Sequence, residues 1–81
     1  MNVMTTIREN RLVMISKIDC YFCILTKALL KLKNIDYVEI IYDDSMLNDI
    51  NYLKKFYEIK TYPMIFIDQK YFGGYKELNE L

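Results

Sequence analysis

The sequence predicts an α/β fold in which three helices cover a small four-stranded mixed sheet, in the order β-α-β-α-β-β-α. In its first half, short apolar runs alternate with amphipathic segments, a pattern that favours a right-handed crossover and parallel strands. The last two predicted strands are separated only by a tight turn, as in an antiparallel hairpin. Only two Gly and one Pro occur among 81 residues, which leaves little chain for loops. We therefore expect a single domain over residues 11–81, preceded by an N-terminal extension over residues 1–10.

The first strand is predicted at residues 11–16 and the first helix from Cys20 to about Asn34. Residues 11–16 form a short apolar run between polar neighbours, as in a strand buried on both faces. After Cys20 the apolar positions repeat every three or four residues, which is typical of an amphipathic helix with its lysines on the opposite face. The expected apolar positions are Ile24, Leu25, Ala28, Leu29 and Leu32, and the opposing lysines are Lys27, Lys31 and Lys33.

The other elements follow in order along the second half of the chain. Residues 37–42 alternate in the manner of a second strand. A second helix is expected over residues 46–57, because the residues before it are good helix caps. The caps are Asp43, Asp44 and Ser45, and the apolar positions are Leu47, Ile50, Leu53 and either Phe56 or Tyr57. The remaining predictions are a third strand at 64–67, a turn at 68–70, a fourth strand at 71–72, a break at Gly73-Gly74 and a short helix at 75–81.

The composition excludes several classes of function. The chain contains no histidine, so it cannot form a Ser-His-Asp triad, a Cys-His pair or a His-ligated zinc or haem site. Its 11 basic and 11 acidic residues balance, which argues against a general nucleic-acid or anionic-membrane binder. No apolar run approaches the ~20 residues needed to cross a bilayer, and residues 1–10 lack the apolar stretch of a signal peptide. We expect a cytoplasmic protein.

The candidate reactive groups are the two cysteines, Cys20 and Cys23. In a reducing compartment a Cys-x-x-Cys pair is more often redox-active or metal-binding than a structural disulfide. Cys20 is placed at the amino end of the predicted first helix, where free backbone N–H groups and the helix dipole favour a thiolate. Lys17 would add a positive charge, whereas Asp19 would oppose it. We therefore expect a depressed pKa for Cys20, with Cys23 one helical turn further on as the resolving thiol.

Two other interpretations of the cysteine pair are open at this point. The cysteines could be inert core residues, since free cysteine is commonly buried. They could also be half of a metal site. A tetrahedral zinc or iron site needs four ligands, so a second chain or small-molecule thiols would have to complete it.

Four motifs occur in an order and spacing that resemble the glutaredoxins, within the thioredoxin-like superfamily. The resemblance covers the chain from about Arg11 to Leu78 and implies a thioredoxin-like fold. In chain order the motifs are Ser16-Lys17 followed by Cys20-Tyr21-Phe22-Cys23, then Thr61-Tyr62-Pro63 before Met64-Ile65-Phe66-Ile67-Asp68, then Gly73-Gly74-Tyr75, then an acidic residue at Glu77.

The resemblance implies a glutathione site beside the cysteines. Pro63 would be a cis-proline that faces the sulfurs, and the backbone of Tyr62 would pair with the glutathione main chain as an added strand. Gly74 and the start of the last helix would hold the γ-glutamyl end, and Lys17 would meet the glycyl carboxylate. The implied glutathione-binding residues are Lys17, Phe22, Thr61, Tyr62, Pro63, Gly74, Tyr75, Lys76 and Glu77, and the implied catalytic residues are Cys20 and Cys23.

The same residues also have simpler structural interpretations. A proline at the start of a strand is common, because the missing N–H does no harm there. The two glycines could form an ordinary turn, and Lys17 could be a solvated surface residue. Aromatic side chains could ring the site, but most tyrosines in such a composition cap the core. These aromatic residues are Tyr21, Phe22, Tyr62, Tyr71 and Tyr75.

The sequence departs from the family pattern at two places. Dithiol glutaredoxins often have Pro-Tyr between the cysteines, where this chain has Tyr21-Phe22. In some members of the family such replacements are associated with a glutathione-ligated [2Fe–2S] cluster shared by two chains. The acidic residue after Gly-Gly is commonly Asp, where this chain has Glu77 with its longer arm.

The function implied by the resemblance is a glutathione-dependent thiol–disulfide oxidoreductase that reduces protein disulfides or glutathione mixed disulfides. One alternative is a [2Fe–2S] carrier, in which Cys20 and glutathione from each of two chains hold the cluster. Another is a redoxin that donates electrons to ribonucleotide reductase and is itself reduced by thioredoxin reductase. The expected partners are glutathione and disulfide-bearing proteins, without nucleic acid or membrane. We expect a monomer unless a cluster joins two copies.

Overall fold

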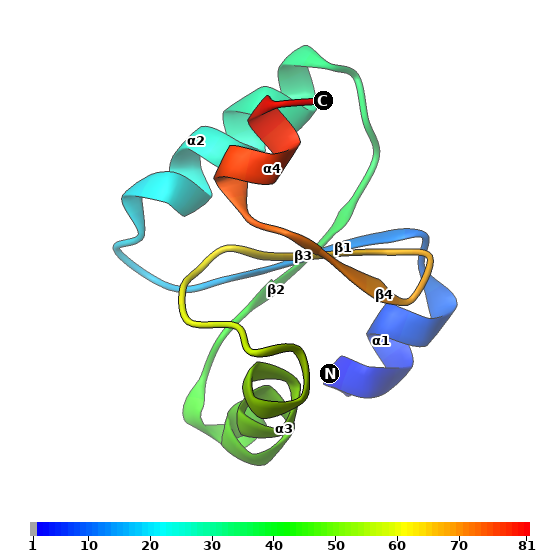
Figure 1. Cartoon of the computed structure of the whole chain (residues 1–81), viewed down its shortest axis with the longest axis vertical. Helices are drawn as coiled ribbons and strands as arrows, with labels where there is room; N and C mark the ends of the chain where they lie inside the picture. The colour runs from blue at the N-terminus through cyan, green and yellow to red at the C-terminus, as the bar shows by residue number, and fades with distance from the viewer. Residues whose placement is uncertain (1) are drawn as a thin grey trace.

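Strand β1 (Leu12–Ser16) is one of two inner strands in a four-stranded sheet whose order is β2-β1-β3-β4 (Figure 1). In this computed structural model, which describes residues 2–81, β1 pairs in parallel with β2 (Val38–Ile41) and antiparallel with β3 (Met64–Ile67). β4 (Lys70–Gly73) continues from β3 as an antiparallel hairpin and forms the other edge. The mixed sheet, the parallel pair and the hairpin predicted from the sequence are confirmed.

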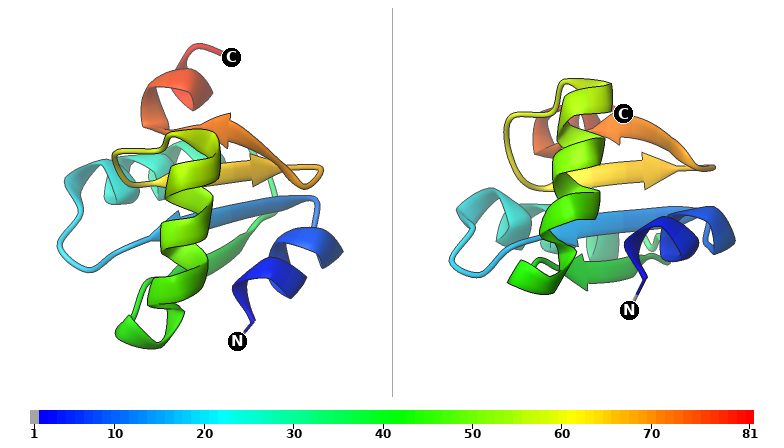
Figure 2. Two further views of the ribbon diagram at one scale, coloured as in Figure 1. Left: turned by 60° about the horizontal axis from the view of Figure 1, so that its bottom comes forward. Right: turned by 90° about the horizontal axis from the view of Figure 1, so that it is seen from below.

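Helices cover both faces of the sheet (Figures 1 and 2). Alternate residues of a strand point to opposite faces, so β1 contributes to two separate apolar cores. Val13 and Ile15 join one core, and Leu12 and Met14 join the other. Helices α1 (Val3–Glu9) and α3 (Leu47–Tyr57) cover the face of Val13. Helices α2 (Tyr21–Leu32) and α4 (Tyr75–Asn79) cover the face of Met14. A short 3-10 helix, η1 (Asp44–Met46), precedes α3.

Helix α1 is the main addition that the structure makes to the predicted fold. The sequence predicted three helices and set residues 1–10 apart as an extension, whereas the described part of the chain forms four α-helices. Asn2 caps α1, because its side chain accepts a 2.9 Å hydrogen bond from the Thr5 backbone N–H. Val3 and Ile7, one turn apart, are 1% and 6% exposed and belong to the core shared with α3. Residues of α1 are therefore part of the packed fold.

The buried face of α2 differs from the predicted one. Ile24 and Leu32, expected on the apolar face, are 61% and 83% exposed. The helix instead buries Cys23, Thr26 and Leu30. The Thr26 hydroxyl is satisfied in this position because it donates a 2.7 Å hydrogen bond to the carbonyl oxygen four residues earlier. A 3.6-residue repeat predicts that a helix forms, but the sheet and α4 decide which of its faces is buried.

In α3 the structure selects Tyr57 over Phe56 as the residue that packs on the core. Ile50 and Leu53 are buried as predicted, whereas Phe56 is 64% exposed. Leu47 was also expected inside and is about half exposed, because it lies in the first turn, at the end of the helix. No helix within residues 2–81 is long and apolar enough to span a membrane.

Helix α4 begins directly after the Gly73-Gly74 turn. The Gly74 backbone N–H donates a 2.7 Å hydrogen bond to Glu77 Oε1, so Glu77 caps its own helix. This bond is the main reason why the pKa of Glu77 lies below its usual value.

Gly73 has a φ of 145°, and a Cβ at this position would lie 2.6 Å from Glu77 Cγ. The turn therefore requires glycine here. Lys70 pairs with Ile67 and Gly73 pairs with Ile65, so β4 extends one residue beyond the predicted strand at each end.

The Ile7→Ala substitution should lower the free energy of unfolding by about 2–4 kcal/mol, because it removes buried methylene groups and leaves a cavity between α1 and the core. Urea unfolding followed by far-UV circular dichroism measures the loss. Glu9→Ala, at an exposed position of the same helix, is the control and should change stability by less than ~0.5 kcal/mol. Equal effects of the two substitutions would contradict the packing of α1 described above.

The Glu77→Gln substitution should lower the free energy of unfolding at pH 7 by roughly 0.5 kcal/mol, a small value because solvent screens this largely exposed group. The pKa of Glu77 is lower in the folded chain than in the unfolded chain. The contribution of its charge is therefore fully present above the unfolded pKa and is lost as the pH falls through the folded pKa.

The measurement is urea unfolding of the wild type and the variant at pH 7 and at a pH well below the ordinary Glu value of about 4.3. The difference between the two proteins should disappear in acid. Glu80→Gln is the control, because a negative charge at the carboxyl end of α4 opposes the helix dipole and its removal should not destabilise the protein. A difference that is the same at both pH values would exclude the capping charge as its cause.

Candidate active site

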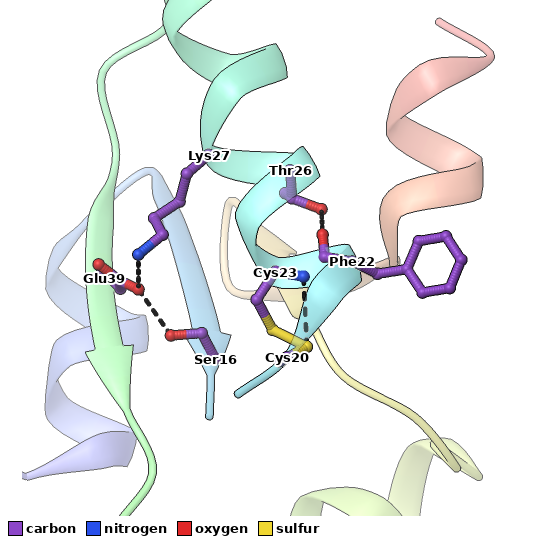
Figure 3. A network of polar contacts seen from close by, with 7 residues as sticks. All are labelled: Ser16, Cys20, Phe22, Cys23, Thr26, Lys27 and Glu39. Carbon is purple, nitrogen blue, oxygen red and sulfur yellow. Dashed lines mark hydrogen bonds and ion pairs between the residues drawn. A yellow bond between two sulfur atoms is a disulfide. The ribbon is translucent and has the colours of Figure 1, made fainter. Parts of the chain in front are cut away.

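Cys20 and Cys23 form a disulfide where the chain passes from β1 into α2 (Figure 3). Their Cα atoms are 5.2 Å apart, within the usual range for disulfides. Cys20 is the N-cap residue of α2, and its Sγ accepts a 3.2 Å hydrogen bond from the Cys23 backbone N–H. The predicted position at a helix start is thus confirmed.

Cys20 is 8% exposed and Cys23 is 3% exposed, so Cys20 is the more accessible of the two. The depressed pKa of the Cys20 thiol stays a prediction, because a disulfide sulfur does not titrate.

The turn before Cys20 depends on Asp19. Its φ of 58° lies in the left-handed region, which Asp tolerates better than most residues. Asp19 is exposed, so its charge is in contact with solvent. The turn redirects the chain from the end of β1 so that Cys20 begins α2.

The Thr61-Tyr62-Pro63 loop and the Gly73-Gly74 turn meet beside the cysteines. The peptide bond between Tyr62 and Pro63 is cis, as predicted. A Cβ at Gly74 would lie 3.1 Å from the Pro63 carbonyl oxygen. The second glycine of the turn is therefore explained by its close approach to the backbone of the cis-proline.

A groove of about 340 Å³ lies between the start of α2, the cis-proline loop and the start of α4. It brings together every residue predicted to bind glutathione except Lys17, and Tyr71 adds a further aromatic wall. Lys17 and both cysteines line a neighbouring hollow of about 210 Å³. The residues predicted to bind glutathione therefore line this groove, apart from Lys17 in the hollow, while their glutathione-binding role stays a prediction.

Aromatic rings connect the cysteine motif to the groove. The Phe22 side chain points toward α4 (Figure 3), where its ring centroid lies 5.7 Å from that of Tyr75. Tyr71 packs inward, with its ring 5.8 Å from that of Tyr57 in α3, and burial raises the pKa of Tyr71. Tyr21, one of the aromatic residues that could have ringed the site, is 68% exposed and does not line the groove.

Two lysines approach the ring of Tyr62 at the edge of the groove. The Lys17 Nζ lies 5.3 Å from the ring centroid and the Lys54 Nζ lies 5.1 Å from it, within the range of a cation–π interaction. Burial is the main cause that raises the pKa of Tyr62, followed by the nearby Tyr42. Lys54 was not predicted as a site residue. No local sequence motif marks Lys54, and only the packing of α3 beside the cis-proline loop brings its ammonium group to the Tyr62 ring.

On the other side of the disulfide lies a polar network that sequence reasoning also missed (Figure 3). The Ser16 hydroxyl donates a 2.6 Å hydrogen bond to Glu39 Oε2, and the Lys27 Nζ lies 3.2 Å from the same oxygen. These three residues come from β1, β2 and α2, and they line the same 210 Å³ hollow as Cys20 and Cys23. The parallel pairing of β1 with β2 creates this arrangement, which no sequence spacing indicates.

The donor set of one chain does not fit an iron–sulfur cluster. A [2Fe–2S] cluster needs four ligands, whereas this chain has two sulfurs suited to it, and they are bonded to each other. Among residues 2–81, no three His, Cys, Asp or Glu side chains come together as a metal site. An arrangement with two chains and glutathione stays a prediction, and we derive no step through a cluster.

Comparison with known proteins gives a matching family model and several similar solved structures. The family model for glutaredoxin matches residues 12–72. The structure of a buckwheat glutaredoxin–glutathione complex is 25% identical, with 95% of this chain and 72% of that chain covered and a TM-score of 0.86. Glutaredoxin 1 from Francisella tularensis complexed with cacodylate is 28% identical, with 85% and 87% covered and a TM-score of 0.69. A dithiolic glutaredoxin from Trypanosoma brucei brucei is 25% identical, with 100% and 86% covered and a TM-score of 0.84. No curated protein matches the sequence.

The family match extends over well more than half of the chain and includes both cysteines. The thioredoxin-like sheet, the disulfide at the start of α2 and the cis-proline beside it are consistent with that match. This chain therefore belongs to the glutaredoxin family and is a thiol–disulfide oxidoreductase with a Cys-Tyr-Phe-Cys dithiol.

Proposed function

We propose that the protein uses glutathione to reduce protein disulfides and glutathione mixed disulfides. The observation that carries the proposal is the groove, which begins at Phe22 between the cysteines and passes the cis-proline to reach the start of α4. An extended peptide thiol can place its sulfur near Cys20 and its main chain beside the cis-proline loop. The related buckwheat glutaredoxin has been solved in complex with glutathione, which supports the same ligand here.

The electrostatics of the groove favour an anionic peptide. Lys17 and Lys54 bring two ammonium groups to the ring of Tyr62, where a carboxylate of the bound peptide would meet them. Lys76 and Glu77 both line the far end of the groove, where their opposite charges offset each other, so the positive charge lies mainly beside Tyr62. Glutathione carries a net negative charge at neutral pH, so this distribution attracts it more strongly than a neutral thiol.

The proposed reaction is two successive thiol–disulfide exchanges. The Cys20 thiolate attacks a substrate disulfide, forms a mixed disulfide and releases the first substrate thiolate, which takes up a proton. The Cys23 thiolate then attacks the Cys20 sulfur, which forms the Cys20–Cys23 disulfide and releases the second substrate thiolate. Two glutathione molecules reduce this disulfide and leave as glutathione disulfide. With a glutathionylated substrate, Cys20 takes the glutathionyl group, and a second glutathione releases it without Cys23.

The two cysteines should therefore give different results when each is replaced. Cys20→Ser should abolish activity in a glutathione-coupled assay with either type of substrate, because the attacking sulfur is lost. Cys23→Ser should retain activity with a small glutathione mixed disulfide but lose most activity with a protein disulfide. Wild-type activity of Cys20→Ser would contradict the mechanism. Supplying thioredoxin reductase in place of glutathione tests the alternative, a redoxin dedicated to that reductase.

Lys54→Ala should raise the KM for a glutathione mixed disulfide by about threefold to tenfold, because one charge that faces the peptide carboxylate is removed. The kcat should change little, since Lys54 does not contact the reacting sulfurs. Steady-state kinetics with glutathione reductase as the coupling enzyme measure both constants. Lys55→Ala, the exposed neighbour in the same helix, is the matched control. The same KM for both variants would remove Lys54 from the proposed site.

A further inference from the structure

The Ser16, Lys27 and Glu39 network is not used by the mechanism above, although it lies beside the disulfide. Glu39 Oε2 accepts from the Ser16 hydroxyl and forms an ion pair with Lys27, at 2.6 Å and 3.2 Å. Ser16 is 2% exposed and is fixed in the last position of β1. Figure 3 shows the three side chains on the β2 side of Cys20 and Cys23. Two opposite charges are thus held in a defined position next to the redox centre.

Partial burial reduces the screening of these two charges by solvent. The Glu39 side chain is 22% exposed and that of Lys27 is 40% exposed, so solvent screens them less than it screens a fully exposed pair. The other charged residues that line the hollow are Lys17 and Asp19, and both are exposed. Lys17 also lies over the ring of Tyr62, at the edge of the groove.

We propose that Ser16 and Lys27 hold the Glu39 carboxylate in a pair beside the disulfide, so that the two opposite charges cancel in the reduction potential of Cys20–Cys23 and the loss of either charge alone shifts it. Reduction by a dithiol breaks the S–S bond, transfers two electrons to the protein and oxidises the dithiol to its own disulfide. It creates sulfurs that bear negative charge when deprotonated. Lys27 stabilises that charge, Glu39 destabilises it, and the pairing of the two balances their effects. Both residues act through the cysteines and are positioning residues. The inference concerns the disulfide itself and does not require glutathione.

Removing either charge should shift the redox equilibrium in opposite directions. Glu39→Gln leaves the Lys27 ammonium unpaired, so the reduced form should gain about threefold to tenfold in its equilibrium with a reference dithiol. A tenfold change corresponds to a potential about 30 mV less negative. Lys27→Gln leaves the Glu39 carboxylate unpaired and should favour the disulfide by a similar factor. The double variant should return to within about twofold of the wild type, because both charges are gone.

The experiment equilibrates the full chain with dithiothreitol redox buffers at pH 9, where a cysteine of ordinary pKa is largely thiolate. The fraction of reduced protein is measured by thiol trapping and mass spectrometry. Lys31→Gln, one turn further along α2 and outside the hollow, is the matched control and should leave the equilibrium unchanged. Urea unfolding of each variant verifies that it is folded. Each single variant has its own expected direction, so if one of them fails to fold, a shift in the wrong direction in the other still overturns the proposal.

A gain of the reduced form in Glu39→Gln and a gain of the disulfide in Lys27→Gln, each larger than the change in Lys31→Gln, support the proposal. General structural damage would not produce this pattern. Shifts in the same direction, or equilibrium constants within twofold of the control, would overturn it. Because the reductant is dithiothreitol, these results do not depend on whether the protein uses glutathione. A failure of the proposed glutathione dependence would instead appear in the coupled assay with Cys20→Ser and Lys54→Ala.

Discussion

The pairing of β1 between β2 and β3 is the constraint on which the rest of the structure depends. Because β1 is buried along its whole length, helices must cover it on both faces, with α1 and α3 on one side and α2 and α4 on the other. Its carboxyl end also fixes the redox centre. The chain leaves β1 at Ser16, turns at Asp19 and begins α2 at Cys20. The sheet therefore determines both the cores and the position of the reactive sulfur.

The active site is assembled from three chain segments that are distant in the sequence. The start of α2 supplies the disulfide, the loop before β3 supplies the cis-proline, and the turn after β4 supplies Gly74. Direct contacts join these segments to one another. The Phe22 and Tyr75 rings join the first and third segments, and the close approach of Gly74 to the Pro63 carbonyl joins the second and third. Glu77 rigidifies the same turn by capping α4.

Charge is distributed unequally on the two sides of the disulfide. On the groove side, Lys17 and Lys54 lie within cation–π range of one tyrosine ring and present positive charge to a ligand. On the β2 side, Lys27 and Glu39 neutralise each other, and Ser16 fixes their geometry. One side can thus serve the recognition of an anionic thiol, while the other adjusts the stability of the sulfur charge. This chain has no histidine, so the position of Cys20 at a helix start and the neighbouring charges are what can control its thiol chemistry.

By itself, the sequence determined the order of strands and helices, the mixed sheet, the Cys20–Cys23 motif at a helix start and the cis-proline that accompanies it. The strands and helices follow from short-range periodicity, and the cis-proline follows from the resemblance of the motifs to those of the glutaredoxins. The tertiary structure alone decided that α1 packs on the core and that α2 buries Thr26 and not Ile24. It also decided that Lys54 lies over the Tyr62 ring and that Glu39 lies beside the cysteines. A repeat specifies a helix but not the neighbour that covers it. Side chains that meet across strands and helices have no fixed spacing along the chain, so only the packed sheet can bring them together.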